Sequence, residues 1–149
     1  MEELLRETII QILQRLAKTI VKYQDPQSGT WYQVTDQGAR EGNYLESSAT
    51  ALFIYTLAKA INKGYIGNEY IEPTQKAFDG MVKTFTRLEE DGSYTITNCC
   101  AVAGLGGDSK RYRDGSFEYY ISEPIIENDP KSVGSFILAA IEYEKMTKK

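Results

Sequence analysis

The stretch Gly29-Thr-Trp-Tyr-Gln-Val-Thr-Asp-Gln-Gly-Ala-Arg-Glu-Gly-Asn-Tyr-Leu-Glu-Ser-Ser-Ala49 decides the fold of this 149-residue chain. It begins as a polar loop that holds the only tryptophan, and it continues into a helix with no charged residue from Ser47 to Ala58. A helix this apolar belongs inside a protein. Polar loop groups are therefore attached directly to a rigid, buried element, which is how binding sites are usually built.

The composition predicts one domain of ordinary size, since an apolar fraction of 42% is enough for a packed core. The net charge of −4 argues against a nucleic-acid partner, which demands a basic face. No apolar run approaches the roughly 20 residues that span a bilayer, so no membrane partner is expected. No secretion signal is recognisable in the sequence, and the choice between cytoplasm and periplasm stays open.

The chain contains no histidine, which excludes Ser-His-Asp and Cys-His catalysis and argues against a zinc site. Its two cysteines, Cys99 and Cys100, are adjacent, and neighbouring cysteines rarely pair because the geometry of such a disulfide is strained. We interpret them as two small buried hydrophobic residues. No metal or other cofactor is expected.

Apolar periodicity and capping residues predict four long helices, near residues 3–22, 46–62, 72–88 and 130–146. The first and third are amphipathic, whereas the second and fourth are apolar all round and are expected to be buried. A short strand is expected within residues 90–96, and residues 113–128 are expected to form a loop. The core stripe of the first helix consists of Leu5, Ile9, Ile12, Leu13, Leu16 and Ile20, and that of the third of Ala77, Phe78, Met81, Val82, Phe85 and Leu88.

The alternation of amphipathic and buried helices predicts α/α hairpins. Both long loops then lie on one face, at the N-termini of the buried helices, where helix dipoles favour anionic ligands. The tripeptides Gly29-Thr-Trp31 and Gly92-Ser-Tyr94 echo each other after the two amphipathic helices, which favours an internal repeat. Two hairpins cannot enclose two fully apolar helices, so self-association or a place in a larger assembly is expected.

Residues 31–49 resemble the unsaturated rhamnogalacturonyl hydrolases and their relatives, the unsaturated glucuronyl hydrolases. Residues 100–107, 113–124 and 128–131 are similar to the C-terminal portion of those enzymes, and the resemblance covers most of the chain from about Gly29. It implies an all-α fold, in which residues 1–149 form a single domain of α/α hairpins that is part of a six-hairpin (α/α)6 toroid. It also implies a missing N-terminal half as the alternative to self-association.

The resemblance implies a substrate, an unsaturated uronyl oligosaccharide of the pectin type (rhamnogalacturonan) made by a polysaccharide lyase. The family hydrates the C4=C5 double bond, the hemiketal opens, and the sugar is released. One aspartate serves as acid and as base. It lies in the N-terminal half of the family, and nothing in this chain matches it, so no catalytic residue is expected here.

Three functions remain open at this point. The chain supplies part of the cleft wall of such a glycosidase, or it is a non-catalytic carbohydrate-binding or interaction module. The third possibility is a structural piece of an unrelated α/α toroid.

The candidate substrate-binding residues each have a structural alternative. The tryptophan could stack on a sugar or anchor its loop in the core. The arginines could bind a uronate carboxylate as bidentate forks or form salt bridges within their own turns. The glutamate and serine at the start of the second helix could bond sugar hydroxyls or cap the helix. The full set is Trp31, Arg40, Tyr44, Glu46, Ser47 and Arg113.

Other polar groups near these residues receive structural interpretations. We interpret Glu41 and Asp114 as turn residues. The glycines at 104, 106 and 107 lack the lysine and the strand context of a phosphate-binding loop, so they indicate a flexible loop.

Overall fold

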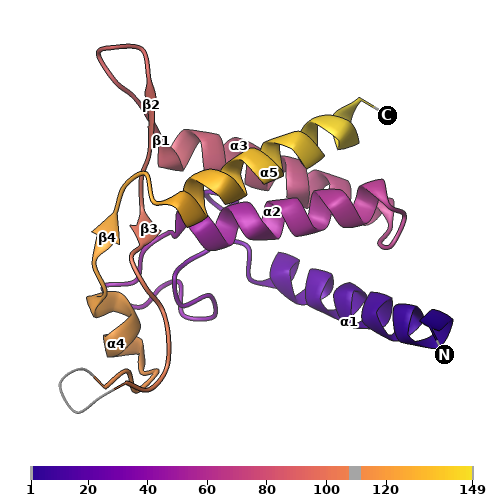
Figure 1. Cartoon of the computed structure of the whole chain (residues 1–149), viewed down its shortest axis with the longest axis horizontal. Coiled ribbons are helices and arrows are strands. Elements are labelled where there is room, and N and C mark those ends of the chain that lie inside the picture. Colours follow the sequence, from indigo (N-terminus) through magenta and orange to yellow (C-terminus); the bar gives the residue numbers. More distant parts are fainter. Residues whose placement is uncertain (1, 108–111, 149) are drawn as a thin grey trace.

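The computed structural model describes residues 2–107 and 112–148. Four long helices form most of it: α1 (Glu2–Lys22), α2 (Ser47–Asn62), α3 (Ile71–Phe85) and α5 (Pro130–Thr147) (Figure 1). The smaller elements are a 3-10 helix, η1 (Asn68–Tyr70), the short helix α4 (Phe117–Ser122), and strands β1 (Thr86–Leu88), β2 (Tyr94–Ile96), β3 (Cys99–Cys100) and β4 (Ile125–Ile126). The four predicted helices are confirmed, with bounds that differ by up to three residues.

Local sequence signals account for most helix ends. Glu46 is the N-cap of α2, and Gly64, just beyond the C-cap of this helix, has a φ of +68° that favours glycine. The Asp129 side chain accepts the backbone N–H of Lys131 at 2.9 Å and caps α5, whose first residue is Pro130.

The third helix ends earlier than predicted, at Phe85, because the next three residues leave it as a strand. β1 pairs antiparallel with β2, with Thr86 opposite Ile96, so the predicted short strand is confirmed. Leu88 is consequently exposed instead of lying in the core. The expected repeat also differs in its details, because Trp31 is fully buried while Tyr94, on this hairpin, is 65% exposed.

Helix α4 lies in a region that was expected to be a loop. It has only six residues, and the Ser116 hydroxyl caps it by accepting the backbone N–H of Tyr119 at 3.1 Å. So short a helix leaves little apolar periodicity to read. The two cysteines form β3, which pairs with β4, and both are free and buried, as predicted.

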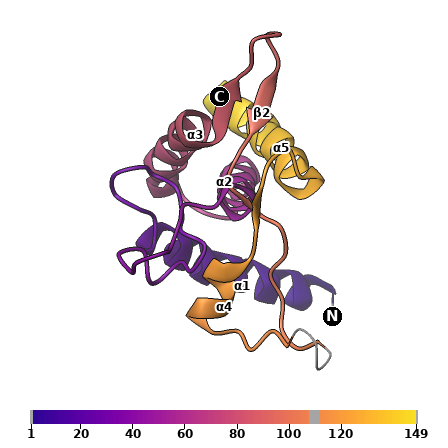
Figure 2. The same ribbon diagram turned by 90° about the vertical axis from the view of Figure 1, so that its left-hand side faces the viewer.

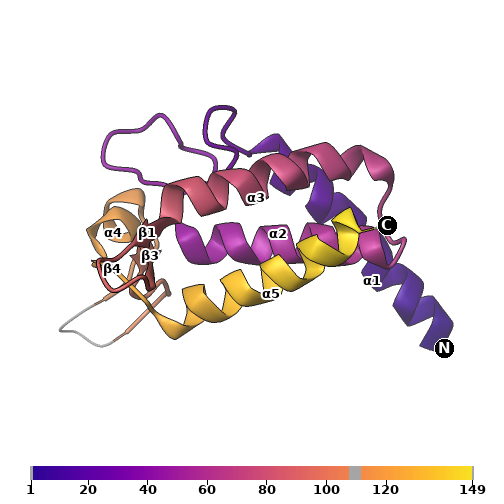
Figure 3. The ribbon, with the colours of Figure 1, turned by 90° about the horizontal axis from the view of Figure 1, so that it is seen from above.

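Helix α2 is the centre of the molecule. It lies between α3 and α5 (Figure 3), and α1 occupies its remaining side (Figure 2). Helices α2 and α5 begin at the same end, where the long loops and α4 gather (Figure 1). This placement of the loops was predicted. The buried cluster around α2 includes Ala17, Ile20, Trp31, Ala51, Ile54, Leu57, Ala77, Met81, Phe85 and Ala139.

The predicted core stripe of α1 is largely wrong. Leu5, Ile9 and Ile12 are 62%, 57% and 50% exposed, and only the second half of the helix reaches the core, through Ala17 and Ile20. No described element covers the first half, since α3 and α5 both pack on α2. We call the exposed stripe, Leu5, Ile9, Ile12 and Leu16, the α1 face.

Helix α5 is also less buried than predicted. Ser132, Ser135, Ala139 and Met146 are its buried residues, whereas the opposite side is open. Leu52 of α2 is exposed as well. No helix among the described residues is long and apolar enough to cross a membrane. The open side of α5, which we call the α5 face, consists of Ile137, Leu138 and Ile141.

Candidate functional site

The loop between α1 and α2 is held in place by backbone and amide hydrogen bonds. The Asn43 side-chain amide donates to the carbonyl oxygens of Val34, at 2.9 Å, and Gln37, at 2.8 Å. Gly29 has a φ of +76°, and a Cβ there would lie 2.6 Å from the Lys76 carbonyl oxygen, so a glycine is required. The sequence analysis did not single out Asn43, although the Gly42-Asn43 pair is typical of a turn.

Trp31 lies inside the core, which favours the anchoring role over sugar stacking. Its exposed fraction is 0%, and its indole N–H donates to the Ile20 carbonyl oxygen at 2.8 Å. Its ring meets the Phe53 ring edge-on, with 5.2 Å between centroids. A side chain without exposed surface has no face to offer a sugar, so Trp31 supports Phe53 from behind.

Glu46 is a structural carboxylate in this fold. It is 1% exposed, and its oxygens accept hydrogen bonds from Ala49 N at 2.6 Å, Ser48 Oγ at 2.8 Å and Cys100 N at 3.0 Å. It therefore caps α2 and fastens β3 to it. The capping alternative accounts for this residue, and direct contact with a ligand would require these donors to be released.

Ser47 and Tyr44 flank Glu46 and are also withdrawn from solvent. Ser47 is 1% exposed, and its hydroxyl has no hydrogen-bond partner among the described residues. Tyr44 is half-buried with its hydroxyl beside the Cys100 thiol. Burial, then the Cys100 contact and the negative charge of Glu46, raise the pKa of Tyr44, which keeps its hydroxyl protonated.

The two arginines pair with carboxylates of α4 and its end, not with acids of their own turns. Arg40 forms an ion pair with Glu118, and its guanidinium lies 3.8 Å from the centre of the Phe117 ring. Arg113 Nε lies 3.8 Å from a carboxylate oxygen of the buried Glu123. The arginines thus form salt bridges, but the alternative of partners within their own turns is wrong, because the partners lie on α4 and at its end and α4 was not predicted.

Asp114 is a turn residue, as the sequence indicated. The Asp114 carboxylate accepts the Ser116 backbone N–H at 2.9 Å, and this bond, more than any other contact, lowers the pKa of Asp114. The glycine-rich loop is partly ordered by a bridge between Gly106 and Arg113. Among the described residues, no group of acidic or cysteine side chains could hold a metal ion.

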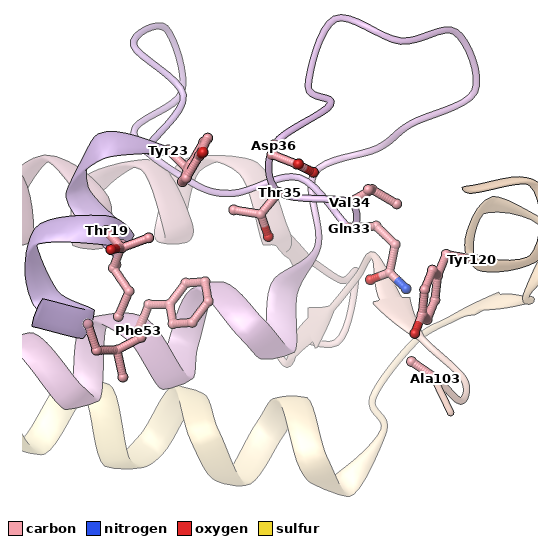
Figure 4. Close-up of a pocket in the computed structure, with 11 residues that line it drawn as sticks. Thr19, Tyr23, Gln33, Val34, Thr35, Asp36, Phe53, Ala103 and Tyr120 are labelled. Carbon is pink, nitrogen blue, oxygen red and sulfur yellow. The ribbon is translucent and has the colours of Figure 1, made fainter. Parts of the chain in front are cut away.

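An open pocket of about 510 Å³ lies beside the loop between α1 and α2 (Figure 4). It is bounded by the last turns of α1, the start of α2 and helix α4. Phe53 of α2 and Tyr120 of α4 stand on opposite sides of it, and Tyr23 follows α1. The loop segment 33–36 contributes three polar residues to it, Gln33, Thr35 and Asp36. None of the six predicted binding residues lines it; the pocket residues used below are Tyr23, Gln33, Thr35, Asp36, Phe53 and Tyr120.

The sequence analysis did not include these residues in the binding set. The available signal was the mostly polar run Gln33 to Asp36, which follows Trp31 and Tyr32. The sequence does not indicate that Phe53 and Tyr120 line the same pocket. They are distant in the chain, and they are brought to its two sides only when α4 folds against the loop.

Comparisons with known proteins give one consistent family. The sequence model of Glycosyl Hydrolase Family 88 matches residues 2–147. Protein Atu3128 of Agrobacterium fabrum is 38% identical over 120 residues, which make up 78% of this chain and 52% of that protein. The chain thus spans about half the length of the curated relatives it matches.

Solved structures agree with the family match. A family 105 glycoside hydrolase of C. acetobutylicum has a TM-score of 0.89 and 44% identity, over 93% of this chain and 38% of that one. A possible family 105 member of Salmonella enterica has a TM-score of 0.76 and 26% identity, over 96% and 32% of the two chains. These neighbours are (α/α)6 toroids, so the predicted partial toroid is confirmed.

Proposed function

Because the chain belongs to glycosyl hydrolase family 88, we propose that it forms part of the substrate-cleft wall of a glycosidase that acts on unsaturated uronides. The whole enzyme would remove the unsaturated uronic acid from lyase-generated oligosaccharides of the rhamnogalacturonan type. It would do so by hydrating the C4=C5 double bond. This chain would contribute contacts with the sugar and not the acid–base group.

The observation that carries this proposal is the position of the open pocket. It lies at the end of the bundle where α2 begins, in a chain whose family match runs over residues 2–147. Loops on a rigid scaffold are the usual place for contacts with a substrate. Aromatic side chains and polar groups together suit a sugar, which has apolar C–H faces and a rim of hydroxyls.

Two carboxylates at this end of the molecule, Asp114 and Glu46, support a non-catalytic role for the isolated chain. An acid that protonates carbon near neutral pH needs a raised pKa, and the pKa of Asp114 is lowered instead. Glu46 already accepts three hydrogen bonds. We therefore expect the chain alone to leave an unsaturated uronide unchanged.

A chimaera tests the proposal directly. Residues 2–147 would replace the matching segment of the C. acetobutylicum enzyme, which is 44% identical. The substrate would be an unsaturated galacturonyl-rhamnose disaccharide, and the readout would be the ultraviolet absorbance of its conjugated double bond. We expect the chimaera to bleach this absorbance and the isolated chain not to do so. A folded but inactive chimaera, or an active isolated chain, would contradict the proposal.

A non-catalytic carbohydrate-binding module is the second candidate. The observation in its favour is that the described residues of this chain form the pocket without help from another polypeptide. A module of this kind would bind sugar alone, yet it would give no activity in the chimaera.

A further inference from the structure

We propose that the pocket takes an uncharged sugar ring and that Asp36 excludes a uronate from it. The inference rests on the proposed function and adds which part of the substrate this chain would hold. The uncharged sugar next to the unsaturated uronate would occupy the pocket, and the uronate itself would lie elsewhere.

Two aromatic walls define the shape of the pocket. Phe53 and Tyr120 face the space from opposite sides (Figure 4). Trp31 packs edge-on against Phe53, and Tyr119 lies 4.9 Å from Tyr120 between ring centroids. Because each ring is in contact with a second aromatic ring, stacking of a sugar there costs little additional ordering entropy. The volume of about 510 Å³ falls in the usual range for small-molecule sites, roughly 300–1,000 Å³.

The polar groups of the loop segment are fixed before a ligand arrives. Gln33 N donates to the Tyr44 carbonyl oxygen at 2.8 Å, and Gln33 Nε2 donates to Cys100 Sγ at 3.1 Å. With its nitrogen occupied in this way, the Gln33 side-chain oxygen lies on the pocket side (Figure 4). Together with Thr35 and Asp36 it offers acceptors to sugar hydroxyls.

Charge decides which sugar fits. Among the described residues that line the pocket, Asp36 is the one with a formal charge. The neighbouring cation, Lys22, lies 4.9 Å from the centre of the Tyr23 ring and outside the lining. Arg40 is paired with Glu118. A uronate would thus bring its carboxylate near Asp36 with no counter-ion among the described residues that line this pocket, whereas sugar hydroxyls would donate charge-assisted hydrogen bonds to Asp36.

Titrations of the whole chain test this assignment. Methyl α-L-rhamnoside and D-galacturonate would be added separately to isotope-labelled protein at pH 7, and backbone amide shifts would be followed by NMR. We expect the rhamnoside to shift the signals of residues 33–36 with saturation in the millimolar range. Galacturonate should bind at least about fivefold more weakly, which corresponds to roughly 1 kcal/mol.

Two variants sharpen the test. Asp36→Asn, at an exposed position, should reduce the preference for the rhamnoside over galacturonate to about twofold or less. Tyr120→Ala should weaken rhamnoside binding by about fivefold or more. The matched control is Asp91→Asn, an exposed aspartate in the β1–β2 turn and outside the pocket, which should change neither value. Far-ultraviolet circular dichroism would verify that each variant is folded.

The possible outcomes separate this inference from the proposed function. No saturable shift of residues 33–36 up to 50 mM rhamnoside, about the weakest affinity the assay detects, would overturn it. Equal binding of both sugars by the unmodified chain would also overturn it. An active chimaera with either result leaves the cleft-wall proposal standing, whereas binding with an inactive chimaera supports the pocket and contradicts the glycosidase role.

Discussion

At the residue scale, two side chains that looked like ligand contacts instead hold the site together. The Glu46 carboxylate joins the start of α2 to β3, and Trp31 joins the loop to the end of α1. Both are almost fully buried. Their substitution should therefore change stability before it changes any interaction with a sugar.

We expect Glu46→Gln to lower the free energy of unfolding by about 1–3 kcal/mol, since an amide NH2 cannot accept the hydrogen bonds that one carboxylate oxygen now receives. Urea unfolding followed by circular dichroism measures this value. Glu41→Gln is the control, because this neighbouring glutamate is exposed. Equal urea midpoints for the two variants would show that the buried bonds of Glu46 contribute nothing.

Trp31 is the only tryptophan, so its fluorescence reports one position. We expect blue-shifted emission and little quenching by iodide, since the indole has no exposed surface. Trp31→Phe should lower the free energy of unfolding by about 1 kcal/mol or more, through the lost bond to the Ile20 carbonyl and looser packing. Tyr94→Phe, at an exposed aromatic, should have no such effect. Strong iodide quenching in the folded chain is the result that would refute the buried position.

At the element scale, the start of α5 depends on one ionised cap. The backbone N–H of Lys131, then the Lys131 ammonium, lower the pKa of Asp129 below its ordinary value of 3.8. The ionised form is thus favoured in the folded state. Its stabilising contribution is present above the ordinary pKa and is lost as the pH falls through the lower folded pKa.

We expect Asp129→Ala to lower the melting temperature at pH 7, because the helix loses its cap. The difference from the unmodified chain should be the same at pH 5. It should shrink below a pH of about 3.8, as the carboxyl is protonated first in the unfolded chain and, at lower pH, in the folded chain. Thermal unfolding at pH 7, 5 and 3 measures it. Glu90→Ala serves as the control, at an exposed position outside any helix. A difference in melting temperature that grows in acid would contradict the predicted direction of this pH dependence.

At the scale of the whole molecule, the α1 face and the α5 face leave apolar surface open on two helices. Contiguous apolar patches of this kind drive association. In a toroid each hairpin has a neighbour on both sides, and this chain covers only 38% of the C. acetobutylicum structure. We propose that further copies of the chain, or further helices of a toroid, cover these faces.

We expect the isolated chain to elute as a dimer or larger species in size-exclusion chromatography and to bind an apolar dye. Ile9→Lys and Leu138→Lys, one on each face, should shift it toward the monomer. Leu105→Lys is the control, since this leucine is 74% exposed in a loop outside both faces. A clean monomer at high concentration with no dye binding would contradict this expectation.

The helices, their caps and the buried state of the cysteines could be predicted from the amino-acid sequence. The helices and their caps depend on contacts within a few residues, such as the Asp129 cap or the glycine at 64, and local contacts of this kind give recognisable residue spacings. The resemblance carried by residues 31–49 added the toroid, which the structural neighbours confirm. The short helix α4 was not predicted, because six residues are too few to show a helical apolar periodicity.

Which side chains are available to a ligand depends on the tertiary structure. A buried carboxylate at a helix start and an exposed one in a loop look alike in a sequence, yet Glu46 is enclosed by donors while Asp36 faces a pocket. The α1 face was likewise predicted to be buried, although its residues are exposed. Apolar periodicity indicates that a helix has an apolar side, but it does not indicate whether another element covers that side. Exposure depends on elements far apart in the chain, such as Phe53 and Tyr120, and those distances are set by folding alone.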